Sequence, residues 1–370
     1  MYLLALIICI LVTPSVSLSG DVIGGNKPLD VKIGQMIMIG FRGLSVNDKS
    51  PVIADIKKRG IGGIILFDYD VPSGSPVRNI ESPDQVRSLV GALQGSSSIP
   101  LFIAIDQEGG KVNRLKEKFG FLPTVSEGYL GRINDLEITK KYAERTAETL
   151  SDLGINVNFA PVVDLNINPD NPVIGKIERS FSADPGVVIR HSIATIDVFH
   201  SHGILSAIKH FPGHGSSRAD SHKGFVDVTE SWSPDELRPF EDIIQSGRCD
   251  MVMTAHIFNA RLDPLWPATL SEKIIGKILR DDLKFDGVVV SDDMQMGAIR
   301  SFYGLETAIK RSILAGCDML IFANNSIFDE NIAAQAIGII KKLVIKGEIK
   351  SERIDESYRR IMRLKEKLKR

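Results

Sequence analysis

The segment richest in reactive side chains is residues 209–222, which read KHFPGHGSSRADSH and hold three of the seven histidines of the chain. Metal binding, phosphate binding and proton transfer are the three chemistries open to it. A zinc site is disfavoured, because His210 ends an apolar run and His214 follows a Pro-Gly turn, whereas zinc needs converging ligands. A phosphate-binding loop is disfavoured too, because Lys-Ser/Thr and a helix do not follow the glycines.

Proton transfer fits His222 and Asp220 best. An aspartate two residues away can accept the second N–H of the imidazole, which fixes the tautomer and stabilises the charged ring. With a reference pKa of about 6.5, an imidazole both gives and takes a proton near neutral pH. We expect Gly213, Gly215 and Ser216 to give this loop the mobility to close over a bound substrate.

A second reactive group ends the apolar run at residues 287–293, which read GVVVSDD. Adjacent residues of a strand point to opposite sides, so only one of Asp292 and Asp293 can face a site at the strand end. The other is expected to cap the following helix. A carboxylate in this position can be a nucleophile, a general base or a cation partner, and the residue type alone does not choose.

Eight short apolar runs alternate with longer amphipathic segments, and these elements must position the reactive residues. The runs are residues 32–41, 61–67, 99–106, 155–164, 204–211, 250–257, 287–293 and 318–325. Continuous apolar runs are typical of strands buried on both faces. Strand then helix, eight times, predicts a single-domain (β/α)8 TIM-like barrel. A doubly wound sheet is the alternative, but no Gly-rich phosphate loop follows the first run.

In such a barrel, reactive residues lie at the C-terminal ends of the strands and on the loops that follow. Five predicted strands end in polar segments: IDQEGGKVNR, APVVDLN, KHFPGHG, TAHI and VSDDMQMGA. A single polar residue at such an end is more often a cap or a buried hydrogen-bonding group. Their coincidence on one rim predicts an active site there.

The N-terminal residues 1–19 predict a secretory signal or a membrane anchor, followed by a barrel domain at residues 27–370. The stretch from Tyr2 to Val12 is apolar, is too short to span a membrane and is followed by small residues. No Lys or Arg precedes it, so an uncleaved anchor stays an alternative. The expected location is the periplasm or the extracellular space.

Charge and cysteine usage exclude further classes of function and linkage. The chain has 45 basic and 46 acidic residues and a net charge of -1, so it lacks the excess of positive charge that is typical of proteins that bind nucleic acid. Cys249 and Cys317 begin strands that are not neighbours in the predicted order. Because two strand spacings exceed the reach of a disulfide, both are expected to be free buried thiols.

The motifs together resemble those of bacterial β-N-acetylglucosaminidases of glycoside hydrolase family three. The loop KHFPGHGSSRADSH is the most specific of them. The segments FIAIDQEGGKVNRL, NFAPVVDLN, IERSF, VMTAHI, PATLS and GVVVSDDMQMGAI resemble the other blocks of the family in the same order. The resemblance covers residues 32–325 and implies the subgroup with a single barrel and no C-terminal sandwich domain.

The resemblance implies roles for eight residues. Asp292 matches the nucleophile of the family, His222 its acid/base and Asp220 the partner of that histidine. The residues that match those holding the terminal sugar are Asp106, Arg114, Arg179, Lys209 and His210. The segment VIGKIERSF is longer than the usual IGERSF-type segment, which bears on the placement of Arg179.

The expected function is that of a retaining exo-β-N-acetylglucosaminidase. It would remove terminal β-linked N-acetylglucosamine from peptidoglycan fragments or chitooligosaccharides through a covalent glycosyl-enzyme intermediate. No metal, organic cofactor or obligate protein partner is expected. The alternatives are a phosphorylase on the same scaffold, another exo-glycosidase such as a β-glucosidase, and a sugar-binding protein that lacks catalysis.

Overall fold

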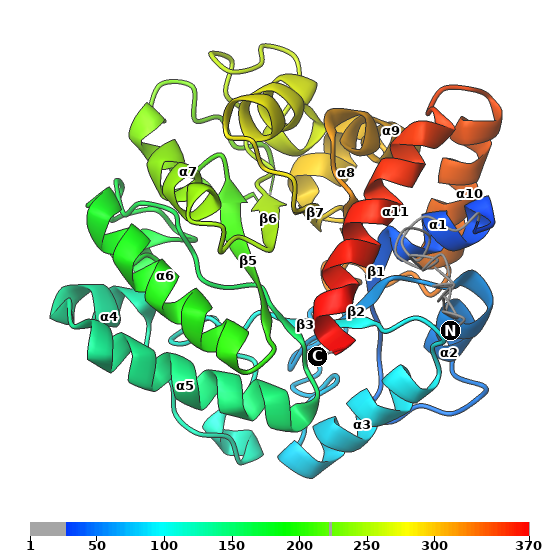
Figure 1. Ribbon diagram of the computed structural model, residues 1–370, viewed down its shortest axis with the longest axis horizontal. Coiled ribbons are helices and arrows are strands. Elements are labelled where there is room, and N and C mark those ends of the chain that lie inside the picture. The colour runs from blue at the N-terminus through cyan, green and yellow to red at the C-terminus, as the bar shows by residue number, and fades with distance from the viewer. Residues whose placement is uncertain (1–26, 222–223, 370) are drawn as a thin grey trace, which may run out of the picture.

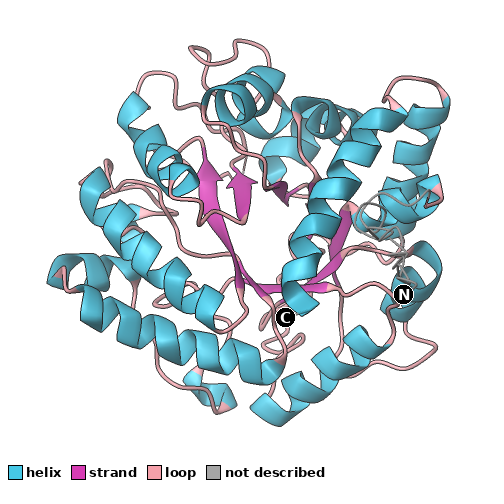
Figure 2. Ribbon diagram, in the orientation of Figure 1, coloured by secondary structure: helices cyan, strands magenta, loops and turns pink. Residues whose placement is uncertain are grey.

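The computed structural model describes residues 27–221 and 224–369. The predicted signal or anchor at residues 1–19 and the predicted acid/base His222 lie outside the described residues. Eight parallel strands form a closed barrel in chain order, with β8 paired to β1, and helices surround it (Figures 1 and 2). The predicted (β/α)8 barrel is therefore confirmed.

The strands are short and almost entirely buried. Their bounds are β1 Ile37–Gly40, β2 Gly63–Leu66, β3 Phe102–Ile105, β4 Val157–Asn158, β5 Leu205–Phe211, β6 Met251–Thr254, β7 Val288–Asp293 and β8 Met319–Phe322. Burial on both faces explains why each reads as a continuous apolar run. Within the described strands, Asp292 of β7 is the one residue that is not buried.

The α-helices surround the strands. They are α1 Leu29–Gln35, α2 Pro51–Ala54, α3 Pro83–Gly95, α4 Glu127–Ile133, α5 Leu136–Leu153, α6 Pro185–Ser201, α7 Arg238–Gln245, α8 Gly297–Tyr303, α9 Leu305–Ala315, α10 Ile332–Ile345 and α11 Ser351–Lys365. The remaining helical segments are η1 Asp55–Arg59, η2 Glu117–Phe119, η3 Gly175–Ile177, η4 Pro234–Leu237, η5 Ala268–Leu270, η6 Lys273–Asp282 and η7 Glu366–Lys369.

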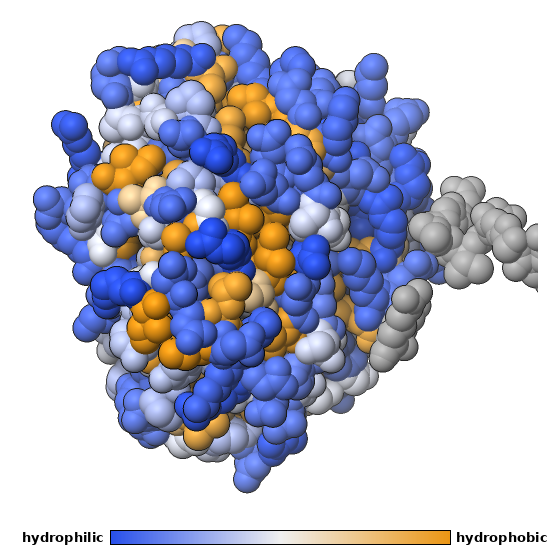
Figure 3. Space-filling view, turned by 60° about the vertical axis from the view of Figure 1, so that its left-hand side comes forward, coloured by the Kyte–Doolittle hydropathy of each residue, from blue (hydrophilic) through white to orange (hydrophobic). Residues whose placement is uncertain are grey.

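Local chemistry sets several of these helix ends as the sequence indicates. The side chain of Ser82 accepts from the backbone N–H of Gln85 at the start of α3. Asp135 caps α5, and Gly154 ends that helix in the left-handed conformation. Figure 3 shows one face of the molecule, on which hydrophilic side chains surround smaller hydrophobic areas, as expected of amphipathic helices that bury one side.

The first strand is shorter than predicted. Residues 32–35, expected to begin it, belong to α1, and β1 starts at Ile37. The side chain of Gln35 donates to the carbonyl of Gly60 and accepts from Nζ of Lys365 at the end of α11. Helix α1 thus packs at the N-terminal end of the barrel, and a short apolar run by itself does not distinguish this from a strand.

The two cysteines of the described chain are free, as predicted. Cys317 is buried, whereas Cys249 is partly exposed. Within residues 27–221 and 224–369, no helix combines the length and the hydropathy required to cross a membrane.

Candidate active site

A pocket with about 1090 Å³ of empty space, including its open mouth, lies at the C-terminal ends of the strands. Seven of the eight predicted site residues line it: Asp106, Arg114, Arg179, Lys209, His210, Asp220 and Asp292. The eighth, His222, lies outside the described residues. The structure thus gathers side chains from five segments of the chain at one rim of the barrel.

Lys209 on β5 lies between two carboxylates. Its Nζ is 2.7 Å from Oδ1 of Asp106 and 2.5 Å from Oε1 of Glu108. Burial by itself would lower the pKa of Lys209, but the two carboxylates outweigh burial and raise that pKa above its usual value. Burial likewise opposes ionisation of Asp106, yet Lys209 and Arg114 hold the pKa of Asp106 below its usual value. Both side chains are therefore charged at neutral pH.

Glu108 also holds Arg179 in a two-point ion pair. Nε and Nη2 of the guanidinium donate to the two carboxylate oxygens at 2.7 and 2.8 Å. Although burial would raise the pKa of Glu108, Arg179 and Lys209 lower it to about 2. The structure thus brings Arg179 into the pocket despite the long segment before it. Sequence reasoning missed Glu108, which follows Asp106 by two residues and shares the contact with Lys209.

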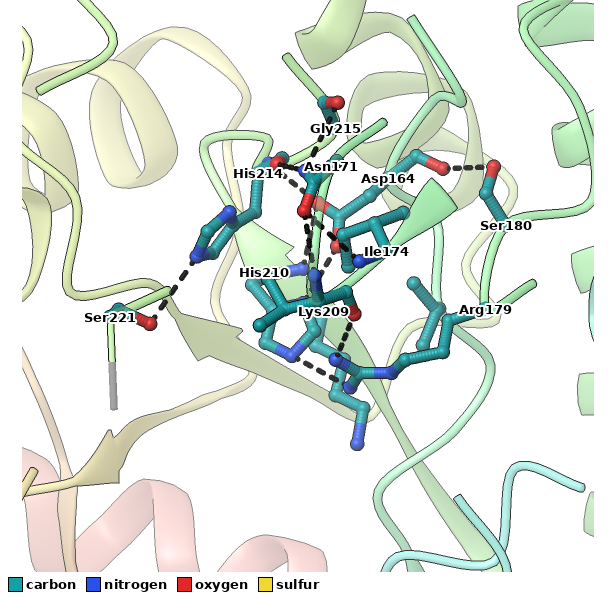
Figure 4. A network of polar contacts seen from close by, with 12 residues as sticks. Asp164, Asn171, Ile174, Arg179, Ser180, Lys209, His210, His214, Gly215 and Ser221 are labelled. Atoms are coloured by element: carbon teal, nitrogen blue, oxygen red, sulfur yellow. Dashed lines mark hydrogen bonds and ion pairs between the residues drawn. The ribbon is translucent and has the colours of Figure 1, made fainter. Parts of the chain in front are cut away.

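His210 is oriented by Asp164, a second residue that sequence reasoning missed (Figure 4). Nδ1 of His210 lies 2.6 Å from Oδ2 of Asp164, and Nε2 lies 3.2 Å from Nη2 of Arg179. Because a guanidinium only donates, Nε2 accepts from Arg179, and Nδ1 donates to Asp164. Oδ1 of Asp164 accepts from the backbone N–H of His214 at 2.7 Å.

The paired aspartates of β7 differ in their surroundings. Asp293 is buried, and its Oδ1 accepts from the backbone N–H of Gln295 and of Ala323, both at 3.0 Å. Asp292 is partly exposed at the pocket, and its Oδ1 accepts from the N–H of Asp293. Asp293 therefore stabilises the turn before α8, but the prediction that it caps this helix is wrong, because Met296 takes the N-cap position and no side chain caps the helix there.

The glycines of the loop after β5 do not provide the mobility expected of them. Residues 212–217 are all buried. A Cβ on Gly215 would lie 1.7 Å from the carbonyl oxygen of Leu165, and a Cβ on Gly213 would lie 2.5 Å from Cβ of Glu236. Glycine is required at both positions because the backbone packs closely against neighbouring segments. Ser216 accompanies them in this packed part of the loop.

His210 and His214 contact each other through their rings. The rings of His210 and His214 lie edge to face with their centroids 5.9 Å apart. Burial lowers the pKa of His214 to about 4, so its ring is neutral at physiological pH. Across residues 27–221 and 224–369, no three or more His, Cys, Asp and Glu side chains are grouped as metal ligands would be.

Comparison with known proteins gives a consistent result. The sequence model described as "Glycosyl hydrolase family 3 N terminal domain" matches residues 28–364. Beta-hexosaminidase A of Pseudoalteromonas piscicida is 34% identical over 91% of this chain and 60% of its own length. A beta-hexosaminidase of Tolumonas auensis is 35% identical over 72% of this chain and 76% of its own length.

Solved structures show the same relationship. A glycoside hydrolase family 3 beta-N-acetylglucosaminidase from Paenibacillus sp. superimposes with a TM-score of 0.84 at 36% identity, covering 93% of this chain and 63% of that one. A beta-N-acetylhexosaminidase from Beutenbergia cavernae gives a TM-score of 0.82 at 25% identity, with 92% and 99% covered. The chain thus spans less than two thirds of some relatives and nearly all of another. By its match to the family model and its identity to these hexosaminidases, the chain belongs to glycosyl hydrolase family 3.

Proposed function

We propose that the protein is a retaining exo-β-N-acetylhexosaminidase that removes a terminal β-linked N-acetylglucosamine. The observation that carries the proposal is the pocket, where Asp292 is partly exposed at a strand end and lines the same space as the paired charges around Lys209. The relatives named as β-hexosaminidases and β-N-acetylglucosaminidases support this substrate class.

The charged pairs suit the hydroxyl groups of a sugar. A hydroxyl both donates and accepts, so it is best satisfied between a carboxylate and a cation. Asp106 offers acceptor oxygens, and Lys209, Arg114 and Arg179 offer donors at the same pocket. Because the ion pairs fix these groups before binding, little ordering is left for the sugar to impose. In this proposal they hold the terminal sugar with the help of His210.

The reaction then follows the double displacement of retaining glycosidases. Asp292 attacks the anomeric carbon as the bond to the leaving oxygen breaks, and His222 gives that oxygen its proton. In the second half, His222 takes a proton from water, the water oxygen attacks the anomeric carbon, and Asp292 is released. Asp220, which lines the pocket, would accept the second N–H of His222 and stabilise its charged form.

A fluorinated N-acetylglucosamine analogue with a good leaving group tests the covalent step. Fluorine slows both steps, and the activated leaving group restores only the first, so the glycosyl-enzyme accumulates. Digestion and mass analysis are expected to place the sugar on Asp292. Label on Asp293 would show that the roles of the pair are exchanged. Inactivation without label on either aspartate would contradict the covalent mechanism and favour attack by the acetamido group of the substrate.

We further propose peptidoglycan fragments or chitooligosaccharides as the natural substrates. The proposal follows from the predicted export signal at residues 1–19, since both polymers occur outside the cytoplasm. Release of N-acetylglucosamine from purified muropeptides and from chitobiose, measured side by side, distinguishes the two. The same assays run with and without phosphate separate hydrolysis from phosphorolysis, because only a phosphorylase yields the sugar phosphate.

A further inference from the structure

The loop after β5 is held from its outer side by the segment that leads into α7, and the key contact there is made by Glu236. We propose that Glu236 is a positioning residue for acid–base catalysis. By fixing the backbone of Gly215 and Ser216, it would hold the segment that carries Asp220 to the pocket and continues to His222. This inference rests on the proposed function.

Glu236 holds the loop by hydrogen bonds to its backbone. Its side chain is fully buried, and Oε2 accepts from the backbone N–H of Gly215 at 2.9 Å and of Ser216 at 3.3 Å. Beside it, Nε1 of Trp232 donates to the carbonyl of Pro212 at 3.1 Å. A buried backbone N–H that loses its acceptor is costly, so these bonds favour one position of the loop.

A structural role in the helix is the simpler interpretation of Glu236, and it accounts for only one of its oxygens. Ser233 and Glu236 form a capping box at η4, in which Oε1 accepts from the N–H of Ser233 at 3.4 Å. The other oxygen, Oε2, serves residues 215 and 216, about twenty positions away along the chain. The two roles can therefore be separated by mutation.

Asp164 and Asn171 also hold the loop by hydrogen bonds to the backbone of His214. Oδ1 of Asp164 accepts from the N–H of His214, and Nδ2 of Asn171 donates to the carbonyl of His214 at 2.7 Å (Figure 4). Asp164 also orients His210, so replacing it would disturb sugar binding as well. Glu236 makes hydrogen bonds to the loop and to Ser233, none of them to a residue assigned to the sugar.

A short series of contacts joins the part of the loop near Gly215 and Ser216 to Asp220. Nε2 of His214 lies 3.3 Å from Oγ of Ser221, the residue directly after Asp220 (Figure 4). The carbonyl of Ser221 in turn accepts from the N–H of Ala298 at the start of α8. A shift of the loop near Gly215 would therefore move Ser221, and Asp220 with it.

Three variants test the inference on the full chain. Glu236→Met keeps the buried volume and removes both acceptors, Glu236→Gln keeps one acceptor oxygen, and Ser233→Ala removes the helix cap alone. Each is assayed with an N-acetylglucosaminide of an acidic phenol, which leaves without help, and with one of a poor leaving group. The inhibition constant of free N-acetylglucosamine reports on the sugar site.

Glu236→Met is expected to lower kcat/KM for the poor leaving group about tenfold more than for the acidic phenol, a part of what general acid catalysis contributes. Glu236→Gln should recover only part of this difference, and the inhibition constant should stay within about twofold. If Glu236→Met does not fold, Glu236→Gln still has to lower kcat/KM for the poor leaving group more than kcat/KM for the acidic phenol. This selectivity has to be larger than in Ser233→Ala. Equal losses of kcat/KM on both substrates would overturn the inference about Glu236 but not the proposed function, and so would the same selectivity in Ser233→Ala. An inactive wild type would overturn the proposed function.

Discussion

Glu108 and Arg179 form a buried ion pair in which two nitrogens of the guanidinium donate to two carboxylate oxygens, and the same carboxylate also contacts Lys209. One anion thus holds two of the cations that face the pocket. Since we propose that both cations bind the sugar, we expect the pair to connect the stability of the fold with the affinity of the site for the sugar.

Glu108→Gln is expected to lower both stability and sugar affinity. Removing one partner of a buried charge pair leaves the other uncompensated, which costs about 3–5 kcal/mol of the free energy of unfolding. Urea denaturation and inhibition by N-acetylglucosamine measure the two effects. The matched control is Glu230→Gln, which breaks an exposed pair with Arg261. An exposed pair contributes about 0–1 kcal/mol, so an equal loss in both variants would contradict the expectation.

The same carboxyl predicts a loss of stability in acid. Arg179 and Lys209 lower the pKa of Glu108 from 4.5 to about 2, so its stabilising contribution is complete above the higher value and disappears as the pH falls through the lower one. The shift corresponds to about 3 kcal/mol. Urea denaturation between pH 5 and pH 2.5 should show the stability of the wild type approaching that of Glu108→Gln. A constant difference would mean that the charge is not what stabilises the pair.

Glu236 predicts the opposite dependence on pH. Burial, with a smaller effect of the nearby Asp164, raises the pKa of Glu236 from 4.5 to about 7. Between these values the unfolded chain has lost the proton that the folded chain keeps, so stability falls as the pH rises. Relative to the wild type, Glu236→Gln should therefore gain about 3 kcal/mol between pH 4.5 and pH 8. Chemical denaturation at these two pH values checks this, and parallel curves would exclude it.

Replacing His222 should affect substrates according to their leaving group. His222→Ala removes the proposed proton donor, so hydrolysis of a glycoside of a poor leaving group is expected to fall about a hundredfold or more, and that of an acidic phenol far less. Asp220→Ala should show the same pattern in weaker form and leave product inhibition nearly intact. Steady-state kinetics on the two substrates provide the measurement. Uniform losses would remove His222 from the role of acid.

Gly215 and Gly224 allow the packing of the loop after β5 to be tested directly. A methyl group at Gly215 would collide with the carbonyl of Leu165, whereas one at Gly224 would meet no atom of the described residues within 4 Å. Gly215→Ala is therefore expected to cost about 1–3 kcal/mol of stability, as overpacking does, and Gly224→Ala much less. Thermal unfolding of both variants provides the comparison. Similar melting temperatures would indicate that the loop is loose at Gly215.

The barrel and the position of its rim could be predicted because the sequence encodes them locally. Each buried strand is an apolar run, and parallel strands carry their C-terminal residues to one side. Lys209 and Asp292 could therefore be placed at the same pocket without knowledge of any contact. The boundaries of a strand within an apolar run are less well encoded. Residues 32–35, at the beginning of the first run, belong to a helix.

The supporting residues of the site could not be found in the same way. Glu108 and Arg179 are 71 positions apart, Asp164 and His210 are 46 apart, and Glu236 and Gly215 are 21 apart. Such pairs form only when the barrel closes, and the presence of a carboxylate in the sequence does not indicate which residue it will contact. The glycines of the loop were misinterpreted for the same reason, since the groups that crowd them come from other segments.

The boundary within the loop after β5 has a consequence for enzyme engineering. Burial continues through Ser217 and gives way to exposed side chains at residues 218 and 219. A donor loop from another glycosidase, grafted to begin after Ser217, would leave the contacts of Asp164 and Glu236 in place. A graft that begins at Pro212 would have to bring both partners with it. The part of the loop that carries the proposed acid/base pair could thus be exchanged without replacing the residues proposed to bind the sugar.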